Sequence, residues 1–221
     1  MTKMASSGKL GLGRRQDMEQ LTIGGIFSNA LTIGLKNAVS LLGAVVLWAL
    51  TVWIPYLNVG TTIGLVGIIA KMGRGEVVSP TEIFDSANRR RMGEFFLVVA
   101  FISMGASIGT MFMIVPGIVI GIAWGLAPLL VLDKGMNPIA AIEQSNNLTY
   151  GKKATIFWGG FLLTLALYVA TIILAFIFTK VHPMLGALVT VACLIVIVAV
   201  SMGVQAYVYR VLVDSEEENP L

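Results

Sequence analysis

Three asparagines, each followed by a glycine five residues later, form the most regular polar pattern in this chain. Asn29, Asn88 and Asn146 lie 59 and 58 residues apart, and a long apolar run follows each Asn–Gly pair. A carboxamide both donates and accepts hydrogen bonds, so three converging amides could bind a polar ligand such as a lipid headgroup. The alternative is that each amide satisfies backbone groups near a helix end and ties that helix to the next segment.

Five basic residues accompany this pattern, directly after the second asparagine and directly after the third glycine. Next to a bilayer, each would contribute on the order of 1 kcal/mol of attraction to anionic headgroups. Basic residues are also typical of loops that stay on the cytoplasmic side of a membrane. The five residues are Arg89, Arg90, Arg91, Lys152 and Lys153.

Few other residues could carry catalysis or coupled transport. No Asp, Glu, Lys or Arg lies in the middle of a predicted span, where ion-coupled carriers place buried charges. The single histidine, His182, falls in a predicted external turn, and the single cysteine, Cys193, is interpreted as a small packing residue. There is no phosphate-binding Gly-Lys-Ser/Thr loop and no nucleophile–base–acid set. We therefore expect no enzyme activity, no cofactor and no metal ion.

The composition indicates the solvent in which the chain folds. Apolar residues make up 57% of the 221 residues and charged residues only 12%, against roughly a quarter charged in soluble domains. Unbroken apolar runs of about 18 residues or more recur, which is the length that a bilayer core about 30 Å thick requires. We therefore predict an all-α, polytopic helical membrane protein with membrane lipids as partners. The chain has no base-reading motif, so no nucleic acid partner is expected.

The Asn–Gly pattern marks a unit that the chain is predicted to use three times. Each unit is expected to be an interfacial amphipathic helix followed by a transmembrane hairpin, which makes about six transmembrane helices in a single membrane domain, 18–213. A disordered cytoplasmic tail is predicted before this domain and an acidic cytoplasmic tail after it. The repeats are about 18–72, 79–132 and 137–213, and the tails are 1–17 and 214–221.

Recurring glycines and prolines support the repeat. The segments 28–36 and 145–153 share six of nine residues. In each unit the glycine is predicted to end the interfacial helix, because glycine adopts the left-handed conformation there at low cost. These glycines are Gly34, Gly93 and Gly151. A proline after each outward span marks an external turn, at Pro55, Pro116 and Pro183.

The charge distribution predicts the topology. Apart from Lys180, the basic residues fall on one side of the predicted spans, so both termini are expected to be cytoplasmic. The segment 59–71 is short for a full crossing and could be tilted or re-entrant. Before the second unit, residues 79–82 (Ser-Pro-Thr-Glu) predict a capping box with proline at the first helical position.

Glycines spaced four apart predict close helix packing in the second hairpin. Without a side chain, glycine lets two helix backbones approach closely, and packing drives helix association in lipid. Contacts within the chain would account for this pattern, and an interface between copies in a homo-oligomer is the alternative. The residues are Gly105, Gly109, Gly117, Gly121 and Gly125.

The stretch 116–158 carries a family resemblance. It contains Pro116, an apolar returning helix, Asp133 and the sequence Ala-Ile-Glu-Gln-Ser (141–145) leading to Gly151. In these features the chain resembles the bacterial membrane domain found fused to glycerophosphodiester phosphodiesterases, with stand-alone relatives of unknown function. The resemblance covers about residues 21–210 and implies a bacterial cytoplasmic (inner) membrane location. The chain has no room for the phosphodiesterase domain, so that catalysis does not carry over.

Two functions fit these observations. The first is a non-enzymatic membrane module, a homo-oligomeric scaffold that organises lipid or partner membrane proteins. The second is an oligomeric channel or facilitator for a small solute or lipid. Polar residues that converge on one stripe would favour the channel, and scattered ones the scaffold. The candidate lining residues are Ser103, Ser107, Thr110, Thr164, Thr171 and Gln205.

Overall fold

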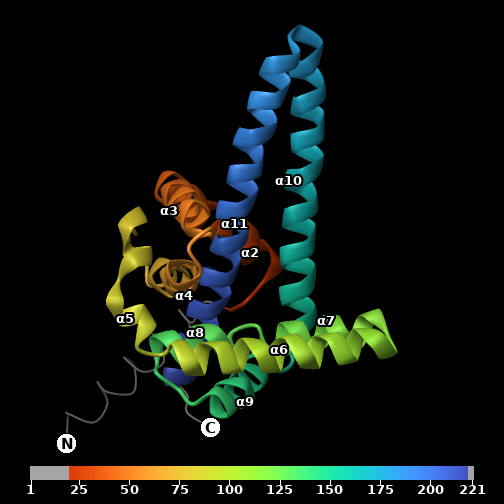
Figure 1. Ribbon diagram of the computed structural model, residues 1–221. Coiled ribbons are helices and arrows are strands. Elements are labelled where there is room, and N and C mark those ends of the chain that lie inside the picture. The colour runs from red at the N-terminus through yellow and green to blue at the C-terminus, as the bar shows by residue number, and fades with distance from the viewer. Residues whose placement is uncertain (1–19, 219–221) are drawn as a thin grey trace, which may run out of the picture.

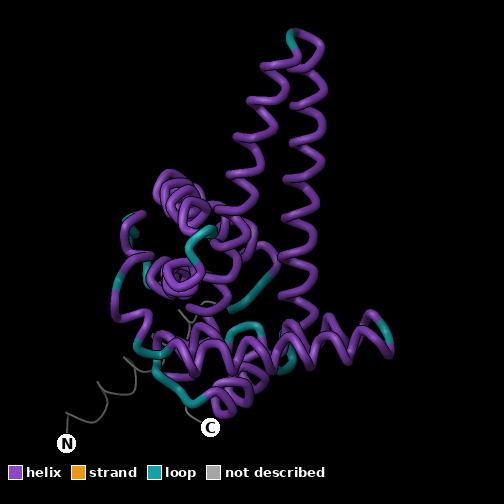
Figure 2. Tube along the Cα trace, in the orientation of Figure 1, coloured by secondary structure: helices purple, strands orange, loops and turns teal. Residues whose placement is uncertain are grey.

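The computed structural model describes residues 20–218, except for the side chains of Asn88 and of residues 216–218. Within that range the chain forms helices joined by short loops and contains no β-strand (Figure 2). The all-α prediction is therefore confirmed for the described residues. The predicted tail at 1–17 lies outside them.

The helices follow one another in three groups. Each group has one or two short helical segments and then a hairpin of an outgoing and a returning helix, and in the second group the returning stretch is divided into α7 and α8. The groups are α2 (Ile23–Lys36), α3 (Ala38–Thr51) and α4 (Pro55–Gly73); the 3-10 helix η1 (Pro80–Phe84), α5 (Ser86–Arg89), α6 (Met92–Phe112), α7 (Ile114–Trp124) and α8 (Ala127–Asp133); and α9 (Pro138–Thr149), α10 (Lys153–Val181) and α11 (Pro183–Glu218).

Four helical stretches in the described part of the chain are long and apolar enough to cross a membrane. They are α6, α7 with α8, α10 and α11; a fifth would result if α2 and α3, bent by 65°, count as one span. Helix α4, which includes the segment 59–71 that the sequence suggests is short for a full crossing, is not among them. The described residues thus include four or five candidate membrane helices, and the predicted arrangement of six is not confirmed.

Two hairpins extend from a shared helical base (Figure 1). The α10–α11 hairpin, which we call the long arm, rises well clear of the other helices. The α6–α7 hairpin, the short arm, runs across the foot of the long arm and points in a different direction. The base consists of α2, α3, α4, α8 and α9, with the last turns of α11.

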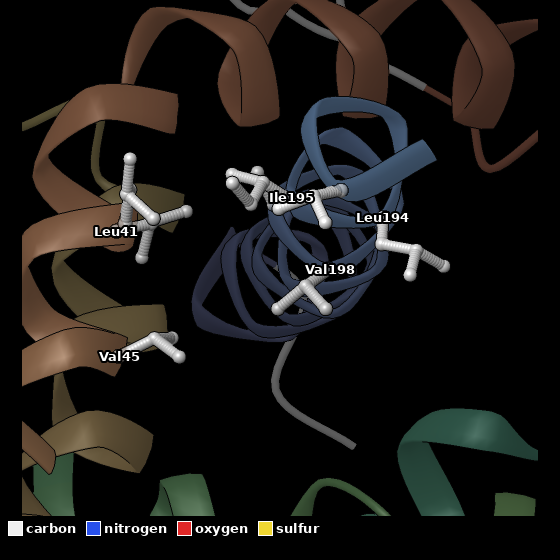
Figure 3. Close-up of a pocket in the computed structure, with 8 residues that line it drawn as sticks. Leu41, Val45, Leu194, Ile195 and Val198 are labelled. Atoms are coloured by element: carbon white, nitrogen blue, oxygen red, sulfur yellow. The ribbon is translucent and has the colours of Figure 1, made fainter. Parts of the chain in front are cut away.

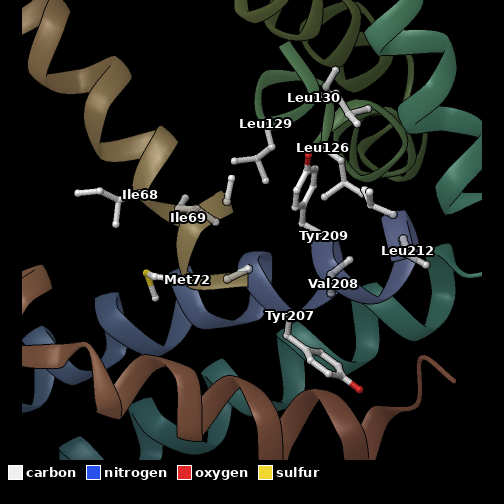
Figure 4. Packing of buried hydrophobic residues seen from close by; sticks show 14 of the residues in the cluster. Ile68, Ile69, Met72, Leu126, Leu129, Leu130, Tyr207, Val208, Tyr209 and Leu212 are labelled. Carbon is white, nitrogen blue, oxygen red and sulfur yellow. The ribbon is translucent and has the colours of Figure 1, made fainter. Parts of the chain in front are cut away.

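The core of the protein lies in the base (Figure 4). Ile68 and Met72 of α4, Leu129 of α8, and Tyr207 and Leu212 of α11 are at most 2% exposed. Burial of one such side chain stabilises the fold by roughly 1.5–3 kcal/mol. The last turns of three returning helices, one from each group, therefore pack into one apolar centre.

The arms, in contrast, expose apolar side chains on all sides. At the tip of the short arm Met111 is 87% exposed and Phe112 81%, and at the tip of the long arm Met184 is 76% exposed. Neither arm has a polar face of the kind that a helix lying on a membrane surface needs. Both arms therefore require an apolar environment that the rest of the described chain does not provide.

The prediction that Gly34 ends the first helix is wrong. Thr22 caps α2 by accepting a hydrogen bond from the Gly25 N–H at 3.0 Å, and the helix continues through Gly34 to Lys36. Gly34 is buried against α11, where a Cβ would lie 2.8 Å from the backbone of Ala199. Glycine is thus needed at this position for a close helix crossing and not for a turn.

The first sharp bend in the chain occurs instead at Asn37, between α2 and α3. This residue is 2% exposed; its Nδ2 donates to the Ile33 carbonyl at 3.0 Å, and its Oδ1 accepts from the Val78 N–H at 3.3 Å. A single buried side chain therefore satisfies one backbone group of α2 and one of the loop before η1, and so ties the end of α2 to a distant segment.

The other two predicted glycine turns differ from each other. Gly151 lies between α9 and α10 with φ of +72°, so the predicted turn is confirmed there. Gly93 is the second residue of α6, and the chain turns before it, at Arg90 and Arg91. The three copies of the motif therefore do not adopt one backbone conformation.

Two further boundaries differ from those predicted. The turn between α6 and α7 is at Met113, and Pro116 lies in the first turn of α7, where a helix has no need of that backbone N–H. Helix α11 continues to Glu218, so the first five residues of the predicted acidic tail, 214–218, are helical. The remaining two turns lie directly before Pro55 and Pro183, and each of these prolines is the first residue of the following helix and not part of the turn itself.

Candidate functional site

A polar junction joins the ends of the three returning helices. Arg74, directly after α4, forms an ion pair with Asp133 at the end of α8. The hydroxyl of Tyr209, on α11, donates to the second oxygen of Asp133 at 2.8 Å. The Asp133 side chain is only 15% exposed, so both of its carboxylate oxygens are engaged in a largely buried place.

Neighbouring charges surround this junction. The hydrogen bond with Glu76 at 2.8 Å raises the pKa of the Arg74 guanidinium above its ordinary value, and the bond with Asp133 raises it further. Arg210 lies with its guanidinium 5.5 Å from the Tyr207 ring. A polar cavity of about 220 Å³ lies among these residues, lined also by Lys134 and Asp214.

The geometry of the junction suits a structural role. A carboxylate whose two oxygens each accept a hydrogen bond, one from a guanidinium and one from a phenol hydroxyl, is held in one orientation. The junction fixes three helix ends relative to one another, with charge-assisted hydrogen bonds that are shorter and stronger than neutral ones.

A second ion pair secures the segment between the first two groups. Lys71 Nζ lies 2.5 Å from Glu82, which also accepts the Ser79 N–H at 2.6 Å, so the predicted capping box is present. Burial alone would raise the pKa of Glu82, but the hydrogen bonds from Lys71 and Ser79 outweigh it and lower that pKa. The helix that the box caps is the short η1.

The repeated asparagines do not converge. Asn29 donates within α2, to the Gly25 carbonyl at 3.1 Å, and Asn146 accepts from Lys153 at 3.0 Å. The side chain of Asn88, on α5, is not among those described. Helix α2 packs mainly on α11 and α10, α5 on α4, and α9 on α7 and α8. At Asn146 the amide ties one helix to the next, as the second interpretation predicts.

The predicted basic residues fall into separate environments. The aliphatic part of Arg89 lies against α4, 3.3 Å from where a Cβ on Gly60 would be. Arg90 is exposed, whereas Arg91 donates to the Gly135 carbonyl at 2.8 Å and so holds the loop before α9. Lys152 caps the start of α10 without a side-chain bond, and Lys153 lies beside it.

Lys153 also borders an apolar groove where the two arms meet. The groove has a volume of about 390 Å³ and lies between α7 and the first two turns of α10. Val119 and Ile122 line it from α7, and Phe157 and Trp158 from α10. The Lys153 ammonium is 5.7 Å from the Tyr150 ring and is the only charged group in the lining.

A second apolar groove, of about 190 Å³, lies between α3 and α11 (Figure 3). Leu41 and Val45 face it from α3, and Leu194, Ile195 and Val198 from α11. All of its lining residues are apolar. The two grooves therefore differ chiefly in the lysine at the edge of the first.

The glycines of the second hairpin are mostly used within it. A Cβ at Gly105 would lie 2.2 Å from the Trp124 ring, and one at Gly117 would lie 2.0 Å from Thr110. Gly109 meets the backbone of Gly117, and Gly125 meets the carbonyl of Gly121. At Gly121 itself no atom lies within 4 Å of an added Cβ, so among the five glycines this position is open.

The junction was not predicted from the sequence, although a signal for it exists. Arg74, Asp133 and Arg210 each stand near the C-terminal end of an apolar returning run, which could have suggested that they meet. In the described part of the chain no group of three His, Cys, Asp or Glu could hold a metal ion. Comparison of the chain with protein-family models, curated proteins and solved structures finds no match.

Proposed function

We propose that this protein is a non-enzymatic, homo-oligomeric scaffold of a bacterial inner membrane that organises lipid or partner membrane proteins. The observation that carries the proposal is the contrast between base and arms. The base is packed and contains ion pairs, whereas the two hairpins that extend from it expose apolar surface on all sides. Contiguous apolar surface of this extent is typical of a membrane or protein interaction site.

The long arm has the features of a membrane hairpin. On α10, Lys153 and Lys180 are about 40 Å apart at a rise of about 1.5 Å per residue, close to the 40–45 Å of a bilayer with its headgroups. Trp158 and Phe176 lie between them, about 27 Å apart by the same rise. Lysine snorkelling favours the positions of both lysines, and the preference of tryptophan for membrane interfaces favours that of Trp158. Both lysines would thus lie at headgroup depth.

The first hairpin suits the cytoplasmic membrane interface better than a full crossing. The Arg89 side chain packs on Gly60, and the Ile83 backbone packs on Gly64, so a charged segment runs beside α4. A guanidinium there would be costly at the centre of a bilayer. Val39 and Leu50 of α3, with Trp53 just after that helix, form an exposed apolar stripe that lipid would cover. In this arrangement the chain has three related units, of which the long arm crosses the membrane, and both termini are cytoplasmic.

The homo-oligomer is supported by the open glycine on the short arm. Gly121 lies on a fully apolar helix with space for a close backbone approach, and such positions suit helix association in lipid. A second copy could supply the apolar environment that this arm lacks.

The channel has less support. Thr110 donates to the Ala106 carbonyl at 2.7 Å within α6, and Thr171 donates to the Leu167 carbonyl at 2.8 Å within α10. These hydroxyls satisfy their own helices, on arms that point in different directions. The candidate lining residues therefore do not form one polar stripe within a single copy.

The proposal is tested by the mass of the full-length protein in mild detergent and in lipid nanodiscs. The wild type is expected to exceed the 23.6 kDa of one chain. Gly121→Leu is expected to lower the mass toward that of one chain without lowering the melting temperature, because no atom of its own copy lies within 4 Å of the added Cβ.

Gly93→Leu is the matched control. Gly93 is also a glycine of α6–α7 with no atom within 4 Å of an added Cβ, but it lies at the base. The Gly93→Leu variant should have the same oligomer mass as the wild type. A wild type of 23.6 kDa in both detergent and bilayers would show that the homo-oligomer is wrong.

A further inference from the structure

We propose that the groove between α7 and α10 binds one acyl chain of an anionic phospholipid, whose phosphate pairs with Lys153. This inference rests on the proposed membrane function and names the class of lipid that the scaffold would hold. It concerns a site that comprises a cavity, a cation and the aromatic residues beside them, all on two helices.

The shape of the groove suits a hydrocarbon chain. Val115, Val119 and Ile122 place one face of α7 along it, at helical spacing, and Phe157 and Trp158 form the opposite wall. Its volume of about 390 Å³ falls in the range of roughly 300–1,000 Å³ that is typical of small-molecule sites. Since the groove lies where two apolar arms meet, lipid chains would surround its open side.

The charge at the groove edge selects the headgroup. Asn146 accepts a hydrogen bond from Lys153, and Tyr150 lies beside it, but neither carries a negative charge. Among the side chains that the structure describes, no carboxylate forms an ion pair with Lys153. The ammonium therefore retains an uncompensated charge next to apolar surface, a combination that complements an anionic amphiphile.

The depth of Lys153 agrees with this assignment. It lies at one end of the roughly 40 Å stretch of α10 between the two lysines, which places it at headgroup level while the groove beside it lies at the level of the upper acyl chains. Trp158, about 7.5 Å further along α10 by the same rise, is half exposed in the groove wall. Phosphate and chain could therefore be bound together by one lipid.

A helix of a second copy fits the groove less well. Packed helices need about 8–10 Å between their axes and contact over several turns, whereas this groove extends over only the first two turns of α10, close to α9. The α3–α11 groove provides the internal comparison, because it is apolar throughout and should show no preference for charge.

The test reconstitutes the full chain in vesicles of equal phosphatidylglycerol and phosphatidylcholine with matched chains. After mild extraction, native mass spectrometry counts the bound lipid and the oligomer mass. We expect the wild type to retain about one phosphatidylglycerol per chain, preferred about fivefold, as roughly 1 kcal/mol per basic residue implies. Lys153→Gln should remove the preference, and Val119→Trp should remove the retained lipid.

Two controls match these variants. Lys180→Gln removes a lysine that likewise lies over a ring, Phe176, at 5.2 Å, but at the other end of α10. Val198→Trp fills the other groove at a residue 46% exposed, against 42% for Val119. Both should retain the lipid and its preference. If Val119→Trp does not fold, Ile118→Trp on the same wall replaces it.

The outcomes separate this inference from the scaffold. A wild-type oligomer without preferred lipid, or with lipid unchanged by Lys153→Gln and Val119→Trp, would overturn the lipid site alone. Loss of oligomer mass rather than lipid in Val119→Trp would assign the groove to a second copy and also overturn it. Preferred lipid on a wild type that stays monomeric would support the site and contradict the homo-oligomer.

Discussion

Tyr209 and Asp133 are 76 positions apart in sequence, yet the tyrosine hydroxyl donates to the carboxylate at 2.8 Å in the base of the protein. This bond and the Arg74 ion pair connect the last turns of three returning helices. The arms can therefore differ in direction and length while their origins stay fixed.

Tyr209→Phe should destabilise the base while leaving the arms intact. The tyrosine is 3% exposed, and a hydrogen bond to a charged group contributes about 1.5–3 kcal/mol. We expect thermal unfolding in detergent to begin at a lower temperature. Tyr168→Phe, at a residue 47% exposed on the long arm, is the control and should unfold as the wild type does. Equal stability of both variants would show that the junction contributes little.

Gly34→Ala should separate α2 from α11. The added Cβ would lie 2.8 Å from backbone atoms of Ala199 and Val200, which cannot move aside as a side-chain end could. We expect a loss of about 1–3 kcal/mol, as for other overpacked sites. Gly24→Ala, on the same helix with nothing within 4 Å, should be neutral or slightly stabilising. Urea or thermal unfolding compares the two, and a neutral Gly34→Ala would contradict the close crossing.

Gly151→Val should be more harmful than Lys152→Ala. Gly151 has φ of +72°, a conformation that costs other residues roughly 1–2 kcal/mol and is especially poor for a β-branched side chain. Space is not the limit, since no atom lies within 4 Å of an added Cβ. Gly151→Asn tests the backbone explanation, because asparagine tolerates this conformation and should restore much of the melting temperature.

The stability contribution of Glu82 should depend on pH. Its pKa is lowered in the folded protein from an ordinary value of 4.5, so its contribution is present above that value and is lost as the pH falls through the lower folded pKa. Glu82→Gln should therefore be less stable than the wild type at neutral pH, by at most about 1 kcal/mol for a partly exposed pair. The difference should vanish well below pH 4.5. Thermal unfolding of both proteins at neutral pH and well below pH 4.5 measures this difference, and an equal difference at both pH values would contradict the role of the Glu82 charge.

Cysteine labelling in intact cells tests how the hairpins lie in the membrane. In a chain whose Cys193 is replaced by alanine, His182→Cys should react with a membrane-impermeant maleimide, because the tip of the long arm is proposed to be external. Tyr56→Cys, at the 76% exposed tip of the first hairpin, should be protected if that hairpin stays at the cytoplasmic interface. Labelling at position 56 would restore the external turn that the sequence predicts there.

Much of the secondary structure could be predicted from local signals. Long apolar runs predict helices of membrane length, and the prolines at 55 and 183 stand at helix starts, where the missing N–H is not needed. The glycine at 151 also has the positive φ expected from its place after a polar helix. Each of these features depends on a few neighbouring residues, so the sequence alone could indicate it.

The repeated motif shows where local reasoning ends. Gly34 and Gly151 occupy matching positions in nearly identical segments, yet one is buried in a helix crossing and the other turns the chain. The difference arises because α11 passes against Gly34, and nothing within the motif records which distant helix will lie there.

Amino-acid composition and local backbone preference suffice to predict that the protein is helical, that several of its helices are apolar enough to cross a membrane, and which short segments could break them. Packing in three dimensions is needed to show that the asparagines stay apart, that Arg74, Asp133 and Tyr209 meet, and that Lys153 borders a groove between two arms. These relationships join residues far apart in the chain. Their free energy comes from packing and paired charges in three dimensions, which spacing along one dimension does not specify.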